Sequence, residues 1–165
     1  MASMQLENQM SAKEQLTANL NNQTETQIHS ERYINYSKSE IGPDPPTIDA
    51  GEEVTFNGFV SKGAVVYAPH SPNKGIPGLS PAWVLAWDTT GYTVFPPIPN
   101  KVYVTCGPNY IIERMTDDEI LKKLNESISP DDSHTDPITK ATINANLTHS
   151  FHRGINSLKA NFGQS

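Results

Sequence analysis

The strongest constraint on this chain is a run of six apolar residues, 82–87, in which small and bulky side chains alternate. Successive side chains of an extended strand point to opposite faces, so one face carries two indoles and a leucine and the other only alanine and valine. Neither face is polar. The pattern therefore predicts a central strand buried on both sides. Its bulky face would fill a core, and its small-residue face would allow a helix to approach closely.

Two further apolar runs, 64–68 and 101–106, lie on either side of this strand in the sequence. The Pro-Asn-Lys-Gly sequence at 72–75 belongs to a loop. We therefore expect residues 64–68 and 82–87 to form an antiparallel pair with a long connection. The region 54–106 is the expected centre of the fold.

Composition narrows the class of protein. The chain has 165 residues, enough for one domain with a core, and a net charge of −6 with acidic and basic residues mixed. It contains no block of Lys and Arg of the kind that neutralises phosphates, which argues against nucleic-acid binding. No stretch approaches the ~20 apolar residues of a membrane span, and residues 1–8 lack the features of a signal peptide. We therefore expect a cytoplasmic protein.

The residues that usually carry catalysis form no recognisable set. Cys106 is the only cysteine, so an intrachain disulfide and a cysteine-based zinc cage are excluded. Its alternation with Val102 and Val104 predicts a small core side chain. Asp117 and Asp118 are paired carboxylates, but they stand at a helix start. The sequence thus predicts a protein that is not an enzyme and has no cofactor.

The N-terminal segment, 1–27, is rich in Asn and Gln and is expected to be a polar leader to a domain that spans 28–165. A capping box at 11–14 and the spacing of Leu16 and Leu20 predict a short helix over 12–20. A mobile leader is the alternative.

Alternating patterns predict further short strands, which are 28–41, 54–59, 110–114, 141–147 and 158–162. Thr116 begins the clearest helix, with acids in its first turn and a capping-box glutamate. Four apolar side chains share one face of this helix, and we expect them to cover the small-residue face of the central strand: Ile120, Leu121, Leu124 and Ile128.

Two loops bear on function. Residues 131–137 hold three Asp and one His, but they lack the spacing of a Ca²⁺ loop or a zinc site, so we expect a solvated turn and no metal. Residues 88–101 place Tyr92, Phe95 and Ile98 on a proline-stiffened connection. Such a loop either folds back as a lid or projects as a contact patch.

Seven to eight short strands without βαβ alternation predict a mainly β fold, an antiparallel β-sandwich with one or two short helices. The order GAVVYA, AWVLAWDT, PNKVYVTCGPNYIIERMTDDEI resembles the plant 23 kDa jasmonate-induced protein family, best over 50–124. More remotely, it is similar to the Nakanori-type lipid-binding proteins and their actinoporin-like β-sandwich. The resemblance implies a stress- or defence-linked protein without established enzyme chemistry.

Two binding functions follow as hypotheses. The first is a non-enzymatic module that binds a lipid head group or a membrane surface. Tyr92 and Phe95 would make the contact, with Trp87, Tyr103 and Tyr110 as neighbours, because aromatic side chains anchor well at a membrane interface. The second is a lectin-like or protein-interaction module in which the same aromatic residues bind a glycan or a partner. Exposed sheet edges would also permit an oligomer.

Overall fold

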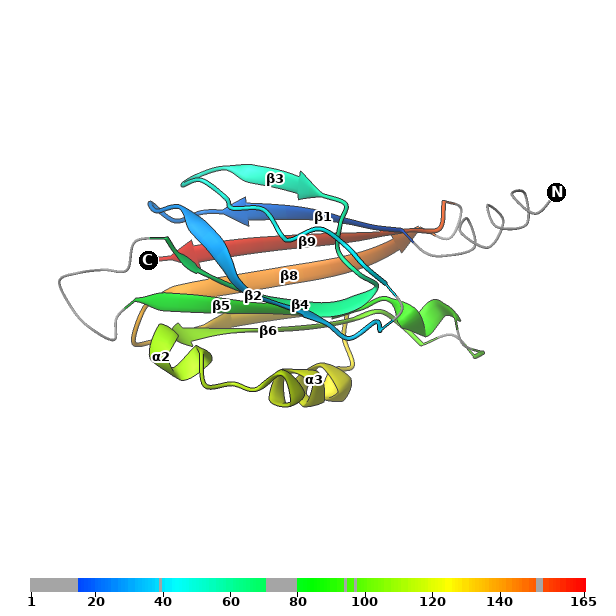
Figure 1. The fold of residues 1–165 in the computed structure, drawn as a ribbon. Coiled ribbons are helices and arrows are strands. Elements are labelled where there is room, and N and C mark those ends of the chain that lie inside the picture. The colour runs from blue at the N-terminus through cyan, green and yellow to red at the C-terminus, as the bar shows by residue number, and fades with distance from the viewer. Residues whose placement is uncertain (1–14, 39, 71–79, 94, 97, 151–152) are drawn as a thin grey trace.

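The computed structural model describes residues 15–38, 40–70, 80–93, 95–96, 98–150 and 153–165, with only the backbone of Gln15, Tyr92 and Thr93. Within these residues the chain forms two stacked β-sheets and two short helices (Figure 1). The expectation of a mainly β sandwich with one or two helices is confirmed.

The first sheet has five strands, and their order is β3 (Glu53–Phe56), β1 (Gln15–Asn22), β9 (Ile155–Gln164), β8 (Ala141–Ser150) and β7 (Asp131–Thr135). The second has four, and their order is β2 (Ile28–Asn35), β4 (Lys62–Pro69), β5 (Pro81–Asp88) and β6 (Lys101–Pro108). Helices α2 (Asn109–Ile112) and α3 (Asp117–Glu126) lie on the outer side of the four-stranded sheet (Figure 1).

Strand β5 is the central element, as its sequence predicts. It pairs antiparallel with β4 on one side and β6 on the other, and all eight of its residues are buried. Its bulky face enters the core between the sheets, where the Trp83 indole donates a hydrogen bond to the Gly163 carbonyl (3.2 Å) and the Trp87 indole donates to the Val60 carbonyl (2.7 Å). These bonds satisfy the polar atoms of both buried indoles.

The small-residue face of β5 packs against the helices, which confirms the expected role of α3. Ala82, Val84 and Ala86 share a second apolar cluster with Ile120 and Leu124, all buried. Small side chains on the strand let the helix lie close to the sheet. The fold therefore has three layers at this point: sheet, sheet and helix.

The start of α3 also matches its prediction, but its end does not. The Thr116 hydroxyl accepts a hydrogen bond from the Glu119 amide (3.1 Å), as an N-cap requires. The helix ends at Glu126, so Ile128 lies beyond it and is 93% exposed. The prediction that Ile128 shares the buried helix face is wrong, because that residue belongs to an extended connection.

The N-terminal expectation is also wrong where the structure describes it. Residues 15–22 form β1, not a helix, and β1 lies between β9 and β3 inside the five-stranded sheet. The alternating side chains of Leu16, Ala18 and Leu20 are all buried in the core between the sheets. The parallel partner β9 stands at the other end of the sequence and supplies the hydrogen bonds that favour the strand. The expected capping box, 11–14, lies outside the described residues.

Two short segments differ from their predicted structures. Residues 109–112 form the helical turn α2 instead of a strand, because the chain leaves β6 at Pro108 and turns to bury Ile112 beside Val84 in the outer cluster. The expected turn at 131–137 begins with strand β7, which pairs with β8. Its Asp132 carboxylate accepts a hydrogen bond from the Val104 amide (2.9 Å), which joins the two sheets at β6.

The contrast between two leucines of α3 tests this packing. Leu124 is fully buried against the sheet, whereas Leu121 is partly exposed. We expect Leu124→Ala to lower the free energy of unfolding by about 2–5 kcal/mol, because it leaves a cavity over β5. Leu121→Ala is the matched control, with an expected loss below about 1 kcal/mol. Urea denaturation followed by tryptophan fluorescence measures both, and equal losses would contradict the assigned helix face.

Candidate functional site

The proline-rich loop between β5 and β6 is anchored at its base. The Asp88 carboxylate accepts hydrogen bonds from the amide (2.9 Å) and hydroxyl (2.6 Å) of Thr90, which starts a single 3-10 turn, η1 (Thr90–Thr93). The Ile98 amide donates to the Gly91 carbonyl (2.8 Å). A Cβ atom on Gly91 would lie 2.2 Å from the Ile98 carbonyl oxygen, so this crossing requires glycine.

The far end of the loop is held by a buried polar contact. Asn100 is 2% exposed and its side-chain amide donates to Asn156 Oδ1 (2.7 Å) at the start of β9. The His149 ring nitrogen Nδ1 lies 2.9 Å from the same oxygen. Because Asn156 Oδ1 is an acceptor, the contact favours the His149 tautomer that carries hydrogen on Nδ1. The loop is thereby tied to both sheets.

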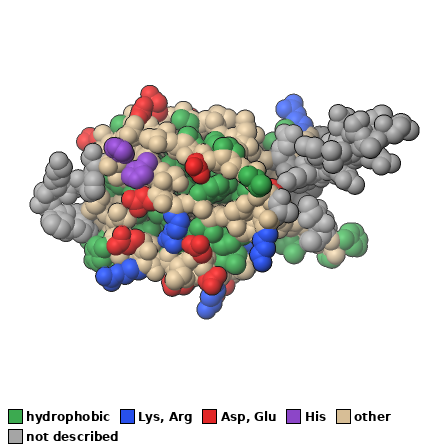
Figure 2. Space-filling model, viewed as in Figure 1, with side chains coloured by type: hydrophobic (Ala, Val, Ile, Leu, Met, Phe, Trp, Pro, Cys, Tyr) green, Lys and Arg blue, Asp and Glu red, His purple; other side chains and the backbone are tan. Residues whose placement is uncertain are grey.

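Between these anchors, apolar side chains project into solvent. Phe95 is 97% exposed and Ile98 is 47% exposed, and the neighbouring connection after α3 presents Ile128. We call Phe95, Ile98 and Ile128 the apolar rim. It belongs to the end of the sandwich opposite α2, where Figure 2 shows hydrophobic side chains at a projecting tip. The exposure of Phe95 favours the contact patch over the lid.

A groove of about 290 Å³ joins the two parts of the rim. Its lining residues are Ile98, Pro99, Lys101, Asn125, Ser127 and Ile128. The Ser127 hydroxyl donates to the Val102 carbonyl (2.7 Å), and the Val102 amide donates to the Ser129 carbonyl (3.0 Å). These bonds hold the connection that carries Ile128 against the start of β6. An apolar surface with one lysine beside it suits the boundary between lipid chains and head groups.

The structure separates the aromatic residues that the sequence grouped together. Trp87 is fully buried and its ring lies 4.3 Å from that of Phe59, so its expected place at the contact surface is corrected to the core. Tyr103 is half-buried on the helix-covered side of the sheet, where desolvation raises the pKa of its hydroxyl. The side chain of Tyr92 lies outside the described part of the chain.

Tyr110 is 46% exposed, but it lies on α2, at the opposite end of β6 from the rim (Figure 1). Eight residues of β6 separate the two ends, a distance of roughly 25 Å. A ligand that binds at the apolar rim therefore does not contact Tyr110 as well. Ile128 was missed as a rim residue because the helical spacing placed it on a buried face.

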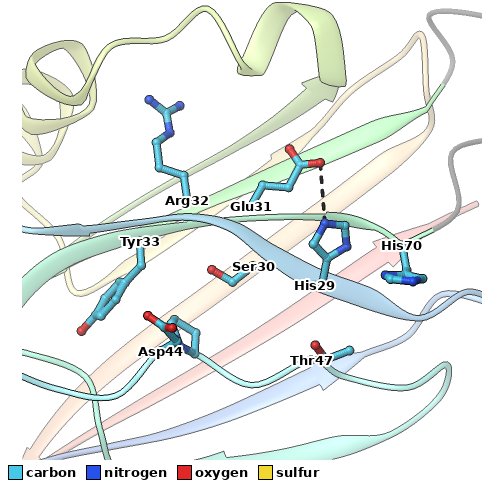
Figure 3. Close-up of a pocket in the computed structure, with 9 residues that line it drawn as sticks. His29, Ser30, Glu31, Arg32, Tyr33, Asp44, Thr47 and His70 are labelled. Carbon is cyan, nitrogen blue, oxygen red and sulfur yellow. Dashed lines mark ion pairs between the residues drawn. The ribbon is translucent and has the colours of Figure 1, made fainter.

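A second, polar pocket of about 440 Å³ lies along β2 and is lined mainly by residues of that strand and of 44–47 (Figure 3). His29 Nε2 lies 3.9 Å from a Glu31 carboxylate oxygen, and the His29 and His70 rings are 5.4 Å apart. Arg32 points away toward α3, where it donates to the Met115 carbonyl (2.7 Å). Arg32 also forms an ion pair with Asp117 (3.1 Å), which lies outside the pocket.

The polar pocket shows no catalytic arrangement. Ser30, Tyr33 and the two histidines line it, and among the described lining residues no hydroxyl group forms a hydrogen bond with a histidine or a carboxylate (Figure 3). Among the described residues, no group of three or more His, Cys, Asp and Glu side chains is placed to hold a metal ion. We therefore take the apolar rim as the candidate site.

Cys106 is buried, as predicted, and its thiol lies 3.3 Å from the Ala141 carbonyl oxygen. Burial raises the pKa of the thiol to about 11, with a hydrogen bond near Asp136 acting in the opposite direction. The protonated thiol is therefore favoured more strongly in the folded chain than in the unfolded one. Its contribution to stability is complete below about pH 8.5 and is lost as the pH rises through about 11.

This environment predicts slow reaction of Cys106 with a thiol reagent such as DTNB at pH 8, because the thiolate is the reacting form and the side chain is enclosed. We expect the folded protein to react at least about a hundredfold more slowly than the protein in urea. Since the chain has one cysteine, the absorbance change reports this side chain alone. Rapid stoichiometric reaction of the folded protein would place Cys106 at the surface.

Comparison with known proteins supports the fold. No family model matches the chain, and no curated protein was found to match it. Among solved structures, the chain is similar to the lipid-binding protein Nakanori, with a TM-score of 0.65 and 9% sequence identity. The similarity covers 98% of this chain and 76% of that one. At this identity the comparison shows a shared fold.

The expected likeness to the Nakanori fold is thus confirmed, whereas membership of the jasmonate-induced family has no support from the family models. None of the helices in the described part of the chain is long and apolar enough to cross a membrane.

Proposed function

We propose that this protein is a non-enzymatic lipid-binding module that contacts a membrane surface through its apolar rim. The observation that carries the proposal is the 97% exposure of Phe95 on a loop whose two ends are anchored. Anchored ends and several prolines reduce the conformational entropy that the loop would lose on binding. A protein with the same fold, Nakanori, is described as lipid-binding, which supports the same class of ligand here.

The expected driving force is hydrophobic. Complete burial of one Phe or Ile side chain contributes about 1.5–3 kcal/mol, so insertion of the three rim residues would give measurable affinity. Lys101 adds about 1 kcal/mol at most beside anionic lipid. Because the chain as a whole carries a net charge of −6, a general attraction to anionic membranes is not expected. Binding should therefore resist moderate salt.

Flotation with liposomes of varied head group and sterol content tests the proposal. We expect Phe95→Ala with Ile128→Ala to reduce the bound fraction at least about tenfold, because the two most exposed rim side chains are removed. The matched control is Tyr110→Ala with Ile111→Ala, which removes an aromatic and an isoleucine, each 46% exposed, at the other end. The control variant should float like the unaltered protein.

Three results would count against the rim. These are failure of the unaltered protein to float with any lipid composition, equal loss in both double variants, and no loss in the rim variant. Unchanged thermal unfolding of the rim variant is expected, since both side chains lie in solvent.

The wider biology is also part of the proposal. The sequence pattern over 50–124 supports a stress- or defence-linked role like that of the jasmonate-induced proteins. We propose the cytoplasm as its place of action. A reporter fusion in plant cells, followed with and without jasmonate treatment, tests both points. Accumulation that does not respond to the hormone would separate this chain from that family.

A further inference from the structure

The outer face of the five-stranded sheet carries a network of hydrogen-bonded side-chain amides and hydroxyls. The lipid proposal does not involve this face. The side chains that point outward alternate with the buried core residues of β1, β3, β7, β8 and β9. They are Thr17, Asn19, Asn21, Glu53, Thr55, Asp131, Ser133, Thr135, Thr142, Asn144, Asn146, Thr148, Ser157, Lys159 and Asn161. Two helices cover the other sheet, on the far side of the sandwich (Figure 1).

Three hydrogen-bonded asparagines, Asn21, Asn161 and Asn144, form a row across neighbouring strands of this face, which we call the amide row. The Asn21 amide nitrogen donates to Asn161 Oδ1 (3.2 Å), and the Asn161 amide nitrogen donates to Asn144 Oδ1 (2.7 Å). The strand register places these residues directly opposite one another. Each bond fixes which way an amide group faces, while each NH₂ and each oxygen keeps further hydrogen-bonding capacity. The row is therefore preorganised.

Asn144, the last residue of the amide row, also lines a surface hollow of about 430 Å³ between β7 and β8. Its lining residues are Asp131, Asp132, Ser133, Asn144, Ala145 and Asn146. Within the hollow, the Asn146 amide nitrogen donates a hydrogen bond to the Asp131 carboxylate. The hollow thus brings together two carboxylates, two amides that both donate and accept, and a hydroxyl, and one of the carboxylates, Asp132, already accepts hydrogen bonds from the backbone amides of Val104 and Ser133. This mixture matches vicinal hydroxyl groups, each of which also donates and accepts.

The choice of asparagine requires a reason. Asparagine is depleted in β-strands, where threonine and valine are more favourable on an exposed face. Yet five asparagines point outward on three adjacent strands, β1, β9 and β8. Their bonds to one another are specific in geometry, but solvent-exposed bonds of this kind contribute little to stability. A recognition role accounts for side chains that the strand itself disfavours.

The charge of the face selects the class of ligand. Among the outward side chains that the structure describes, only Glu53, Asp131 and Lys159 are charged, and they lie on separate strands. Such a surface lacks the cation cluster that would select a sulfated or phosphorylated ligand. The described outward side chains also form no apolar patch of the kind that a protein partner would bury. We infer that the hollow and the amide row bind a neutral oligosaccharide, with Asp131, Asn144 and Asn146 as its main contacts.

The dimensions agree with an extended ligand. Neighbouring strands are about 4.8 Å apart, so the distance from Asn21 on β1 to the hollow at β7 is roughly 14 Å. The hollow would bind one sugar residue, and the amide row would orient those that follow. The inference differs from the lectin-like hypothesis above, because no aromatic residue takes part. It is also independent of the apolar rim, which lies at one end of the sandwich.

An array of neutral oligosaccharides, with sulfated forms of the same glycans beside them, tests the inference. We expect retention on a subset of the neutral glycans and competition by the free sugar. Asn144→Ala with Asn146→Ala should reduce retention at least about tenfold, because two sets of hydrogen bonds are lost. Asn19→Ala with Thr55→Ala is the matched control. It removes a bonded pair (2.9 Å) at the other end of the face and should leave retention unchanged.

The outcomes separate this inference from the lipid proposal. Retention that survives Phe95→Ala with Ile128→Ala supports an independent glycan site, whatever the liposome result. Absence of retention at millimolar glycan would overturn the inference, as would stronger retention of the sulfated forms or equal losses in both amide-face variants. Concentration-dependent dimerisation abolished by Asn144→Ala with Asn146→Ala, without sugar binding, would assign the face to a second copy instead. Thermal melting of each variant verifies its fold.

Discussion

Burial of β5 on both faces is the constraint on which the rest of the structure depends. A strand with indoles on one side and alanines on the other must be covered twice, since neither face tolerates water. The five-stranded sheet covers Trp83 and Trp87, and α3 covers Ala82 and Ala86. The remaining strands extend these two layers outward. The asymmetry in side-chain size decides which layer is a sheet and which is a helix.

This double coverage leaves two kinds of surface for function. One is the end of the sandwich, where the connection from β5 to β6 projects Phe95 while Asp88 and Asn100 anchor it. The other is the outer face of the five-stranded sheet, where amide groups bond across the strands. The first surface is apolar, as the proposed lipid contact requires, and the second is polar with few charged side chains, as the inferred sugar site requires. A rigid scaffold that carries both follows the common separation of core and recognition surfaces.

Local pattern was sufficient where a strand pairs with strands that are its neighbours in the sequence order, and where a helix carries its own cap. The strands over 64–68, 82–87 and 101–106 and the helix that begins at Thr116 all formed as predicted. At β1 and β7, pairing with another strand decided the structure and the local pattern did not. The spacing of Leu16 and Leu20 fits a helix as well as a strand, and pairing with β9, remote in sequence, decided between them. Strand β7 has almost no apolar residues and exists because β8 offers it hydrogen bonds.

The candidate site divides in the same way. The sequence by itself determined that a stiff connection at 88–101 carries aromatic and aliphatic side chains, because proline and residue type are local properties. Only the tertiary structure decided which apolar side chains, in this connection and elsewhere, face water. It buried Trp87, placed Tyr110 at the far end and brought Ile128 beside Ile98. Exposure depends on what packs against a residue, and those neighbours come from parts of the chain that no local pattern relates.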